Sequence, residues 1–170
     1  RRAAGVGCAD GRELRADAVV MAPGRQGAGW LMAECRRLGL TVSTNAVDIG
    51  VRVEVPAVVM EPLTKVLYES KLVYYTPTFD DQVRTFCMNP GGVVSLENYG
   101  DVVTVNGHSY ADQAGANTNF ALLVSTHFTE PFNDPITYGK SIARLANLLG
   151  DDIIVQRLSL IHTSEPTRPS

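Results

Sequence analysis

The chain has 170 residues, of which 45% are hydrophobic, and carries a formal net charge of -3 at pH 7. This composition is typical of a folded domain with a sizeable core, and the mild negative charge without a Lys or Arg run disfavours nucleic acid and anionic membrane surfaces as partners. No apolar stretch approaches the ~20 residues of a membrane span. We expect a small molecule, rather than a membrane or nucleic acid, as the partner, and the oligomeric state stays open.

The first forty residues predict a hairpin, a strand and a helix. Residues 3–9 and 13–22 form the arms of the hairpin, which turns at Asp10-Gly11. The apolar run 18–22 indicates a buried strand of a parallel sheet, which Pro23 and Gly24 end. Apolar residues then follow at helical spacing, with Gly39 as a stop: Ala28, Leu31, Met32, Cys35 and Leu38. Such a strand, turn and helix place N–H groups at a ligand-binding corner.

The middle of the chain predicts several short strands. Valine and isoleucine alternate with polar residues over 48–55, and Pro56 ends that strand. Residues 57–67 are ambiguous, because Pro62 interrupts any long helix. Further strands are expected at 72–75, 83–88, 92–96 and 102–105, separated by turns at 89–91 and 98–101. The Asn106-Gly107 pair reads as another hairpin turn.

The last part of the chain predicts a strand, a helix and a tail. Residues 120–127 form an apolar strand, and Asp134-Pro135 provides an N-cap followed by proline at the first helical position. The helical stripe consists of Ile142, Leu145, Ala146 and Leu149, and it ends at Gly150. Residues 159–170 lose all periodicity and resemble translated sequencing-adaptor read-through. We expect a non-native tail there, the alternative being a genuine disordered tail.

These elements predict a mixed α/β chain, an α+β fold in which a small α/β part precedes a β-rich part. We place the first part at residues 1–46 and the second, which includes the returning helix, at 47–158, followed by the tail at 159–170. The three cysteines lack CxxC spacing, which indicates a reducing compartment without a structural metal site. Cytoplasmic localisation is the default expectation.

Several segments, in order, resemble a known family. Residues 18–28, AVVMAPGRQGA, resemble the second nucleotide-contacting motif of two-dinucleotide-binding-domain flavoproteins, where a short turn passes close to FAD. Three later segments and the residues Asn119-Phe120-Ala121 extend this likeness: VDIGVRVE at 47–54, VRTFCMNPGG at 83–92 and VNGHS at 105–109. Together they resemble the NAD(FAD)-utilising FAD-dependent dehydrogenase family over about residues 16–158.

The resemblance implies an FAD cofactor, with NAD(P)H as a possible electron donor. It implies cofactor contacts at Ala22, Pro23, Gly24 and Arg25, in a partial Rossmann-like FAD-binding domain joined to a β-rich insertion or substrate domain. The family's glycine-rich GxGxxG loop is not matched, since Gly5-Val6-Gly7 lacks the third glycine. We therefore expect an internal fragment of a flavoprotein that is inactive by itself.

The sharpest chemical candidates lie at residues 84–87, which we expect on the substrate side of the flavin. Arg84 can steer an anion, and Cys87 can react with an electrophile or serve as a small buried hydrophobe. Strand alternation places Thr85 and Cys87 opposite Arg84 and Phe86.

The remaining polar candidates carry weaker signals. Asn106 is a further substrate-side candidate, and His108 and His127 are possible acids or bases outside any recognisable triad or metal motif. Asp48, Arg52 and Glu54 share one strand face, for which a salt-bridged or solvated role is the simplest interpretation.

Three function classes remain open. The first is an FAD-dependent oxidoreductase, in which the flavin supplies the redox chemistry and the protein orients the substrate. The second is a cysteine-dependent hydrolase or transferase that pairs Cys87 with His108 or His127. The third is a catalytically silent binding domain derived from a flavoprotein.

Overall fold

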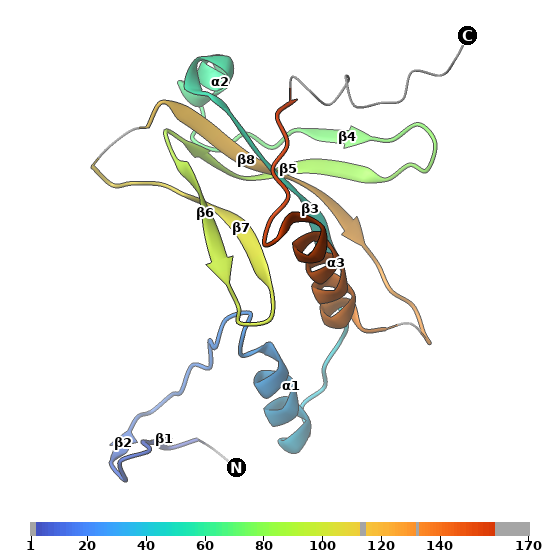
Figure 1. The fold of residues 1–170 in the computed structure, drawn as a ribbon. Helices are drawn as coiled ribbons and strands as arrows, with labels where there is room; N and C mark the ends of the chain where they lie inside the picture. The colour runs from blue at the N-terminus through green and yellow to red at the C-terminus, as the bar shows by residue number, and fades with distance from the viewer. Residues whose placement is uncertain (1–2, 113–114, 132, 159–170) are drawn as a thin grey trace. The chain divides into compact units, whose positions relative to one another are not determined.

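The computed structural model describes residues 3–112, 115–131 and 133–158, and it divides the chain into two units, Arg1–Ser43 and Thr44–Ser170 (Figure 1). Helices and antiparallel sheets are mixed along the chain, which confirms the α+β fold class. The predicted tail at 159–170 lies outside the described residues. None of the described helices is long and apolar enough to cross a membrane.

The first unit begins with the predicted hairpin. β1 (Gly5–Gly7) pairs antiparallel with β2 (Glu13–Arg15), and the N–H of Cys8 donates to the carbonyl of Arg12 at 2.8 Å across the turn. Both arms are shorter than the sequence pattern indicates, because the strand pairing runs only from Gly5 opposite Arg15 to Gly7 opposite Glu13.

The predicted buried strand at 18–22 is wrong. These residues form no strand, and Val20 is 89% exposed. A strand must pair its N–H and C=O groups with a neighbour, and no described strand pairs with this segment. All described ladders are antiparallel, so the expected parallel sheet is also not found among the described residues. The apolar run is an exposed connection that leads into the Pro23-Gly24 turn.

The predicted first helix is confirmed as α1 (Ala28–Arg37). Four residues of its expected stripe are half-buried, namely Ala28, Leu31, Met32 and Cys35, whereas Leu38 is exposed. Gly39 ends the helix in a left-handed conformation with φ of 69°. The N–H of Gly39 donates to Arg36 at 3.0 Å and that of Leu40 to Cys35 at 2.9 Å, which is the Schellman pattern of helix ends.

The second unit is built around a four-stranded antiparallel sheet. Its spatial order is β3 (Val47–Pro56), β8 (Asn117–Thr126), β5 (Gln82–Pro90) and β4 (Val73–Tyr75). The four strands confirm the predictions at 48–55, 120–127, 83–88 and 72–75. The ambiguous segment after Pro56 forms the short helix α2 (Ala57–Thr64), which contains Pro62 near its end.

A separate hairpin consists of β6 (Val93–Asn98) and β7 (Val103–His108). Its turn at 99–102 agrees with the prediction, and the N–H of Tyr99 donates to the carbonyl of Val102 at 2.9 Å. The predicted turn at Asn106-Gly107 is wrong, because both residues lie inside β7 opposite Ser95 and Val94. Pairing along six residues of β6 outweighs the local turn preference of this dipeptide.

The last helix, α3 (Pro135–Gly150), begins as predicted. The Asp134 carboxylate accepts a hydrogen bond from the N–H of Thr137 at 3.0 Å, which caps the helix. The helix faces the strands with Gly139, whose Cβ position lies 3.3 Å from a methyl of Val47. Leu145 and Leu149 of the predicted stripe are therefore exposed, at 56% and 81%.

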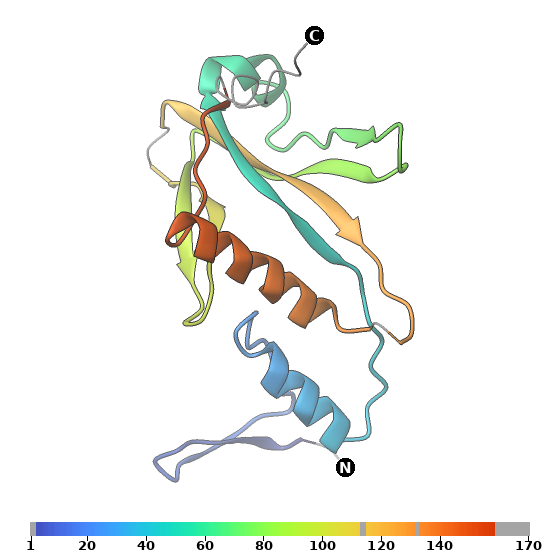
Figure 2. The same ribbon diagram turned by 45° about the vertical axis from the view of Figure 1, so that its right-hand side comes forward.

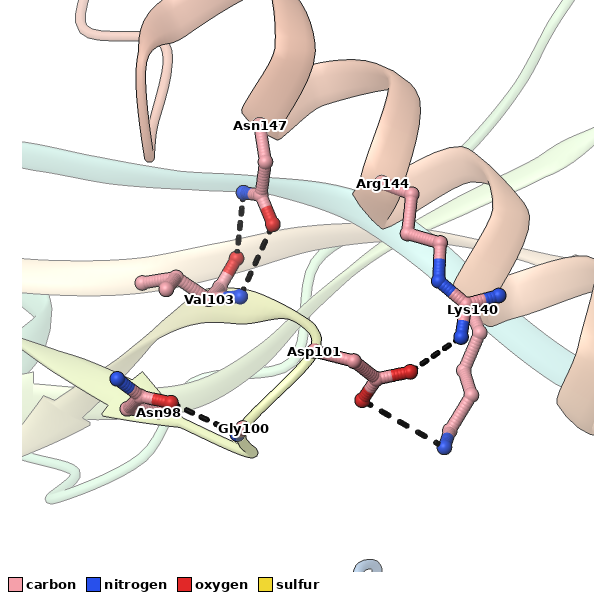
Figure 3. A network of polar contacts seen from close by, with 7 residues as sticks. All are labelled: Asn98, Gly100, Asp101, Val103, Lys140, Arg144 and Asn147. Atoms are coloured by element: carbon pink, nitrogen blue, oxygen red, sulfur yellow. Dashed lines mark hydrogen bonds and ion pairs between the residues drawn. The ribbon is translucent and has the colours of Figure 1, made fainter.

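Polar contacts join α3 to the β6–β7 hairpin (Figure 3). The carboxamide of Asn147 accepts from the N–H of Val103 at 2.9 Å and donates to its carbonyl at 2.8 Å, as a neighbouring strand would. Asp101, in the hairpin turn, is bonded by Arg144 and lies 4.0 Å from the ammonium of Lys140. Figure 2 shows α3 running from the start of β3 to this hairpin. The helix therefore anchors the hairpin at its turn.

We expect the contact between Asp101 and Arg144 to make stability depend on pH. The hydrogen bond from Arg144, with the nearby Lys140 charge, holds the pKa of Asp101 below its usual value. The stabilisation is complete above the unfolded-state pKa of about 3.9 and is lost as the pH falls through the lower folded-state value. Asp101→Asn should lower Tm at pH 7, and the difference from wild type should vanish in acid. Arg144→Gln should give the same pattern, and a pH-independent difference in Tm would contradict the prediction.

We expect Gly50→Ala to be strongly destabilising. A Cβ at Gly50 would lie 1.8 Å from the backbone oxygen of Leu122, so β3 and β8 would have to separate. We expect a loss above the roughly 1–3 kcal/mol typical of overpacking, measured by urea unfolding. Gly29→Ala is the matched control, because its Cβ meets nothing within 4 Å and it lies in a helix. A loss at Gly50 no larger than at Gly29 would show that the strands adjust freely.

Candidate functional site

Strand β5 carries a bulge at Cys87-Met88, where its ladder with β8 shifts register. Phe86 lies opposite Ala121 and Asn89 lies opposite Asn119, so β5 has one residue more than β8 between these pairs. Cys87 has φ of 49°, a left-handed conformation that costs a non-glycine residue roughly 1–2 kcal/mol. Bulges and strained backbone concentrate beside functional sites. The surroundings of Cys87 are therefore a candidate functional site.

Three side chains bind the two backbone polar groups of Cys87. Nη2 of Arg52, on β3, donates to the carbonyl oxygen of Cys87 at 2.6 Å, and Nδ2 of Asn89 donates to the same oxygen at 2.8 Å. The N–H of Cys87 donates to the Glu69 carboxylate at 3.1 Å. Hydrogen bonds to charged groups are the stronger ones, so these contacts account for how the strained residue is held.

The same guanidinium binds Asn119, which is completely buried. Nε and Nη2 of Arg52 donate to Oδ1 of Asn119 at 2.9 and 2.6 Å. Nδ2 of Asn119 is sealed from solvent and has no hydrogen-bond partner among the described residues. Arg52 and Cys87 are half-buried, and the Cys87 thiol lies 3.8 Å from Nδ2 of Asn89. The result is a partly buried cluster rich in hydrogen-bond donors.

A short chain of hydrogen bonds leads from this cluster to the surface. The Ser109 hydroxyl donates to Oδ1 of Asn89 at 2.8 Å, and the Tyr68 hydroxyl lies 3.1 Å from the Ser109 oxygen. Tyr68 is 67% exposed, whereas Asn89 is only 8% exposed. The polar interior around Cys87 is thus connected to an exposed phenol.

Gly107 allows β7 to approach the cluster. A Cβ at this position would lie 1.7 Å from Nη2 of Arg52 and 2.1 Å from Nδ2 of Asn89. The backbone of β7 therefore packs directly against the guanidinium. The four later segments that carry the family resemblance meet in this cluster. They contribute Arg52, then Cys87 and Asn89, then Gly107, and finally Asn119.

Arg84 and Phe86 lie together on β5, away from these contacts. Nη2 of Arg84 donates to the Asp48 carboxylate at 2.6 Å, and its guanidinium carbon lies 5.1 Å from the centre of the Phe86 ring. The Ser125 hydroxyl donates to the same carboxylate at 2.5 Å. The charge of Arg84 is therefore already paired within the protein.

Thr85 and Asn106 make contacts that support the fold. The hydroxyl of Thr85, which is 3% exposed, donates to the carbonyl of Ser70 at 2.9 Å and accepts from the N–H of Leu72 at 2.8 Å. Nδ2 of Asn106 donates to the Glu97 carboxylate at 2.8 Å within the β6–β7 hairpin. Both side chains use their polar groups inside the protein, and a role for either toward substrate stays a prediction.

Neither histidine candidate is joined to Cys87. His108 is exposed and its ring stacks edge-on with Tyr110 at 5.2 Å between ring centres, and His127 is exposed just after β8. Among the described residues, no hydrogen bond connects Cys87 with either imidazole. Within the same residues, no three His, Cys, Asp or Glu side chains are grouped so that they could hold a metal ion. All three cysteines are free.

The proposed cofactor residues of the first unit form an exposed turn before α1. Ala22, Pro23, Gly24 and Arg25 are all exposed, and Gly24 has φ of 69°. Gly27 follows at the N-cap of α1, where a Cβ would lie 2.4 Å from the Pro23 ring. Gly27 therefore packs against Pro23, whereas Gly24 is the residue of this turn with a left-handed backbone conformation.

Sequence reasoning missed the importance of Arg52, Asn89 and Asn119. Arg52 was assigned to a salt-bridged or solvated strand face, whereas its guanidinium is half-buried and bonded to Cys87 and Asn119. Asn119 belongs to an apolar strand, where a buried amide requires a polar partner. An arginine and an asparagine within otherwise apolar strands were the available signal.

Residues 46–146 match the family described as FAD-dependent protein, C-terminal domain-like. This match covers more than half of the chain, so the chain belongs to that family. The curated proteins compared with the chain gave no match. The Cys87 cluster lies entirely within the matched residues.

We expect Gly107→Ala to displace the Arg52 guanidinium. The added methyl group would occupy the space of Nη2, so the bonds to Cys87 and Asn119 would be broken or bent. The free energy of unfolding should fall by about 1–3 kcal/mol. The thiol of Cys87 should also react faster with iodoacetamide, because its backbone is no longer held. Unchanged stability together with unchanged thiol reactivity would contradict the described packing.

Proposed function

We propose that this chain supplies the substrate-side domain of an FAD-dependent oxidoreductase, with the Cys87 bulge bordering the reaction site. The observation that carries the proposal is the strained Cys87 residue, whose backbone is held by Arg52, Asn89 and Glu69 while its side chain is half-exposed. A fold has no structural need to keep a left-handed cysteine where glycine would fit. Membership in an FAD-dependent family supports a flavin as the neighbouring group.

The cluster offers chemistry that suits a flavin and its substrate. The isoalloxazine ring supplies the redox chemistry and presents oxygen and nitrogen acceptors along one edge. Arg52, which Asn119 holds in place, brings an N–H donor, and Tyr68 and Ser109 bring hydroxyl groups. In this proposal these residues orient the substrate and exclude water, and the Cys87 thiol contacts the reacting molecule.

The remaining parts of the proposal concern the cofactor and the substrate. The Pro23-Gly24 turn would flank the FAD, since Gly24 has a backbone conformation that leaves room for close approach. NADH or NADPH would supply electrons to the flavin, and the substrate would be a small molecule. A cysteine-dependent hydrolase gains no support, because no described contact pairs Cys87 with His108 or His127.

We expect Cys87→Gly to separate stability from activity in the flavoprotein that contains this domain. Glycine tolerates the left-handed backbone, so Tm should stay equal or rise. The carbonyl that accepts from Arg52 is retained, so flavin content should not change. Reduction of the flavin by NADH or NADPH, followed anaerobically by absorbance, should slow at least about tenfold, a barrier increase of roughly 1.4 kcal/mol.

Cys35→Ala is the matched control, because Cys35 is a half-buried free cysteine of α1. It should leave the reduction rate unchanged. Alkylation of Cys87 by N-ethylmaleimide should also be slower in the flavin-loaded protein than after flavin removal. A wild-type reduction rate in Cys87→Gly, together with an alkylation rate of Cys87 that is the same with and without flavin, would reject a site at this bulge.

A further inference from the structure

Arg52 has no carboxylate partner among the described residues, and unlike exposed arginines without one it is half-buried. Four others form ion pairs with an aspartate or glutamate, namely Arg12, Arg37, Arg84 and Arg144. These four side chains are 25–75% exposed, whereas the charge of Arg52 is half-buried and its acceptors are neutral oxygens. A partly buried charge is normally paired, because desolvation without a counter-charge is costly.

The hydrogen bonds of Arg52 leave one nitrogen of its guanidinium unused. Nε and Nη2 are bonded to Asn119 and Cys87. Nη1 has no hydrogen-bond partner among the described residues. It is also absent from the buried polar atoms without a partner, so solvent can reach it. Asn119 adds a buried amide nitrogen without a partner to the same group. Both unused groups are donors, so the missing partner is an acceptor.

The guanidinium is also held in a fixed orientation. Three hydrogen bonds of 2.6–2.9 Å and the adjacent backbone of Gly107 restrict it. A donor that is already ordered loses little conformational entropy when it binds a ligand. The open Nη1 carries two N–H groups of a charged guanidinium, and charged donors form strong hydrogen bonds with carboxylate oxygens.

We infer that Arg52 is a binding residue for the carboxylate of a small organic acid, with Nη1 as the donor and Asn119 as the residue that positions it. The half-exposed Cys87 thiol belongs to the same cluster, so the bound acid would lie beside it. The assignment of this acid as the substrate rests on the proposed function. The binding itself requires no flavin and is tested without it.

The test uses the 170-residue chain and sodium benzoate as the probe. The Nε–Hε signal of Arg52 is followed by ¹⁵N NMR at constant ionic strength, with sodium chloride replaced stepwise by benzoate. We expect a saturable shift of this signal with a dissociation constant of about millimolar. Absence of a saturable shift at Arg52 in the folded wild-type chain would overturn the inference.

Asn119→Asp is the decisive variant. It keeps the shape of the side chain but places a carboxylate against Nε and Nη2, which supplies the missing counter-charge. Benzoate affinity should fall at least about tenfold while the chain stays folded. Arg52→Lys is the second variant, and its benzoate affinity is read from the backbone N–H signal of Gly107, which packs against the side chain at position 52. It should also lose affinity, because one ammonium cannot replace the separate nitrogens that hold Asn119, Cys87 and the ligand. Wild-type affinity in either folded variant would overturn the inference.

Arg84→Gln is the matched control, because it removes an arginine of the same sheet whose charge is paired with Asp48. Its benzoate affinity should equal that of the wild type. A loss as large as in Asn119→Asp would indicate nonspecific charge attraction and overturn the inference.

A final titration uses FAD instead of benzoate. If the Arg52 signal shifts saturably with FAD but not with benzoate, the site belongs to the cofactor and the carboxylate assignment is overturned. A wild-type rate of flavin reduction in Cys87→Gly, by contrast, would reject the proposed function and leave benzoate binding intact, so the two proposals fail separately.

Discussion

The guanidinium of Arg52 fixes three strands and the bulge between them. It projects from β3, binds the side chain of Asn119 on β8 and reaches the carbonyl of Cys87 on β5. Backbone ladders join only neighbouring strands, whereas this side chain spans all three. Since Gly107 packs against the same guanidinium, the β6–β7 hairpin also depends on its position. Displacement of Arg52 therefore affects both sheets of the second unit.

Because of the bulge, neighbouring residues of β5 have different structural roles. Thr85 is tied to Ser70 and Leu72 through its hydroxyl, and Met88 is 2% exposed in the core. Cys87 lies between these two anchors with its backbone bound to side chains. Its own side chain is thereby free of any ladder or core role. In a regular strand, side chains alternate strictly between the two faces, so the side chain of Cys87 would be committed to one face of the sheet.

Sequence patterns predicted the elements correctly where their effect depends only on residues that are close together in the chain. Asp134-Pro135 started α3 and Gly39 ended α1, since caps act within a few residues. The run at 18–22 failed because a strand also needs a partner, which no residue of the run specifies. Asn106-Gly107 failed because its turn preference competes with pairing to β6. The bulge was not predicted, since a period of two assumes an unbroken ladder.

The site was predicted as a set of segments but not as a set of contacts. Arg52 bonds residues that are 35 and 67 positions away in the chain, distances over which periodicity carries no information. The chemistry of the residue explains why it serves both structure and binding. A lysine offers one compact ammonium, whereas arginine has separate nitrogens in one rigid plane. Two of these nitrogens hold Asn119 and Cys87, and because the group is planar, the third nitrogen is oriented by the same bonds. The contacts that stabilise the bulge therefore also position the open donor.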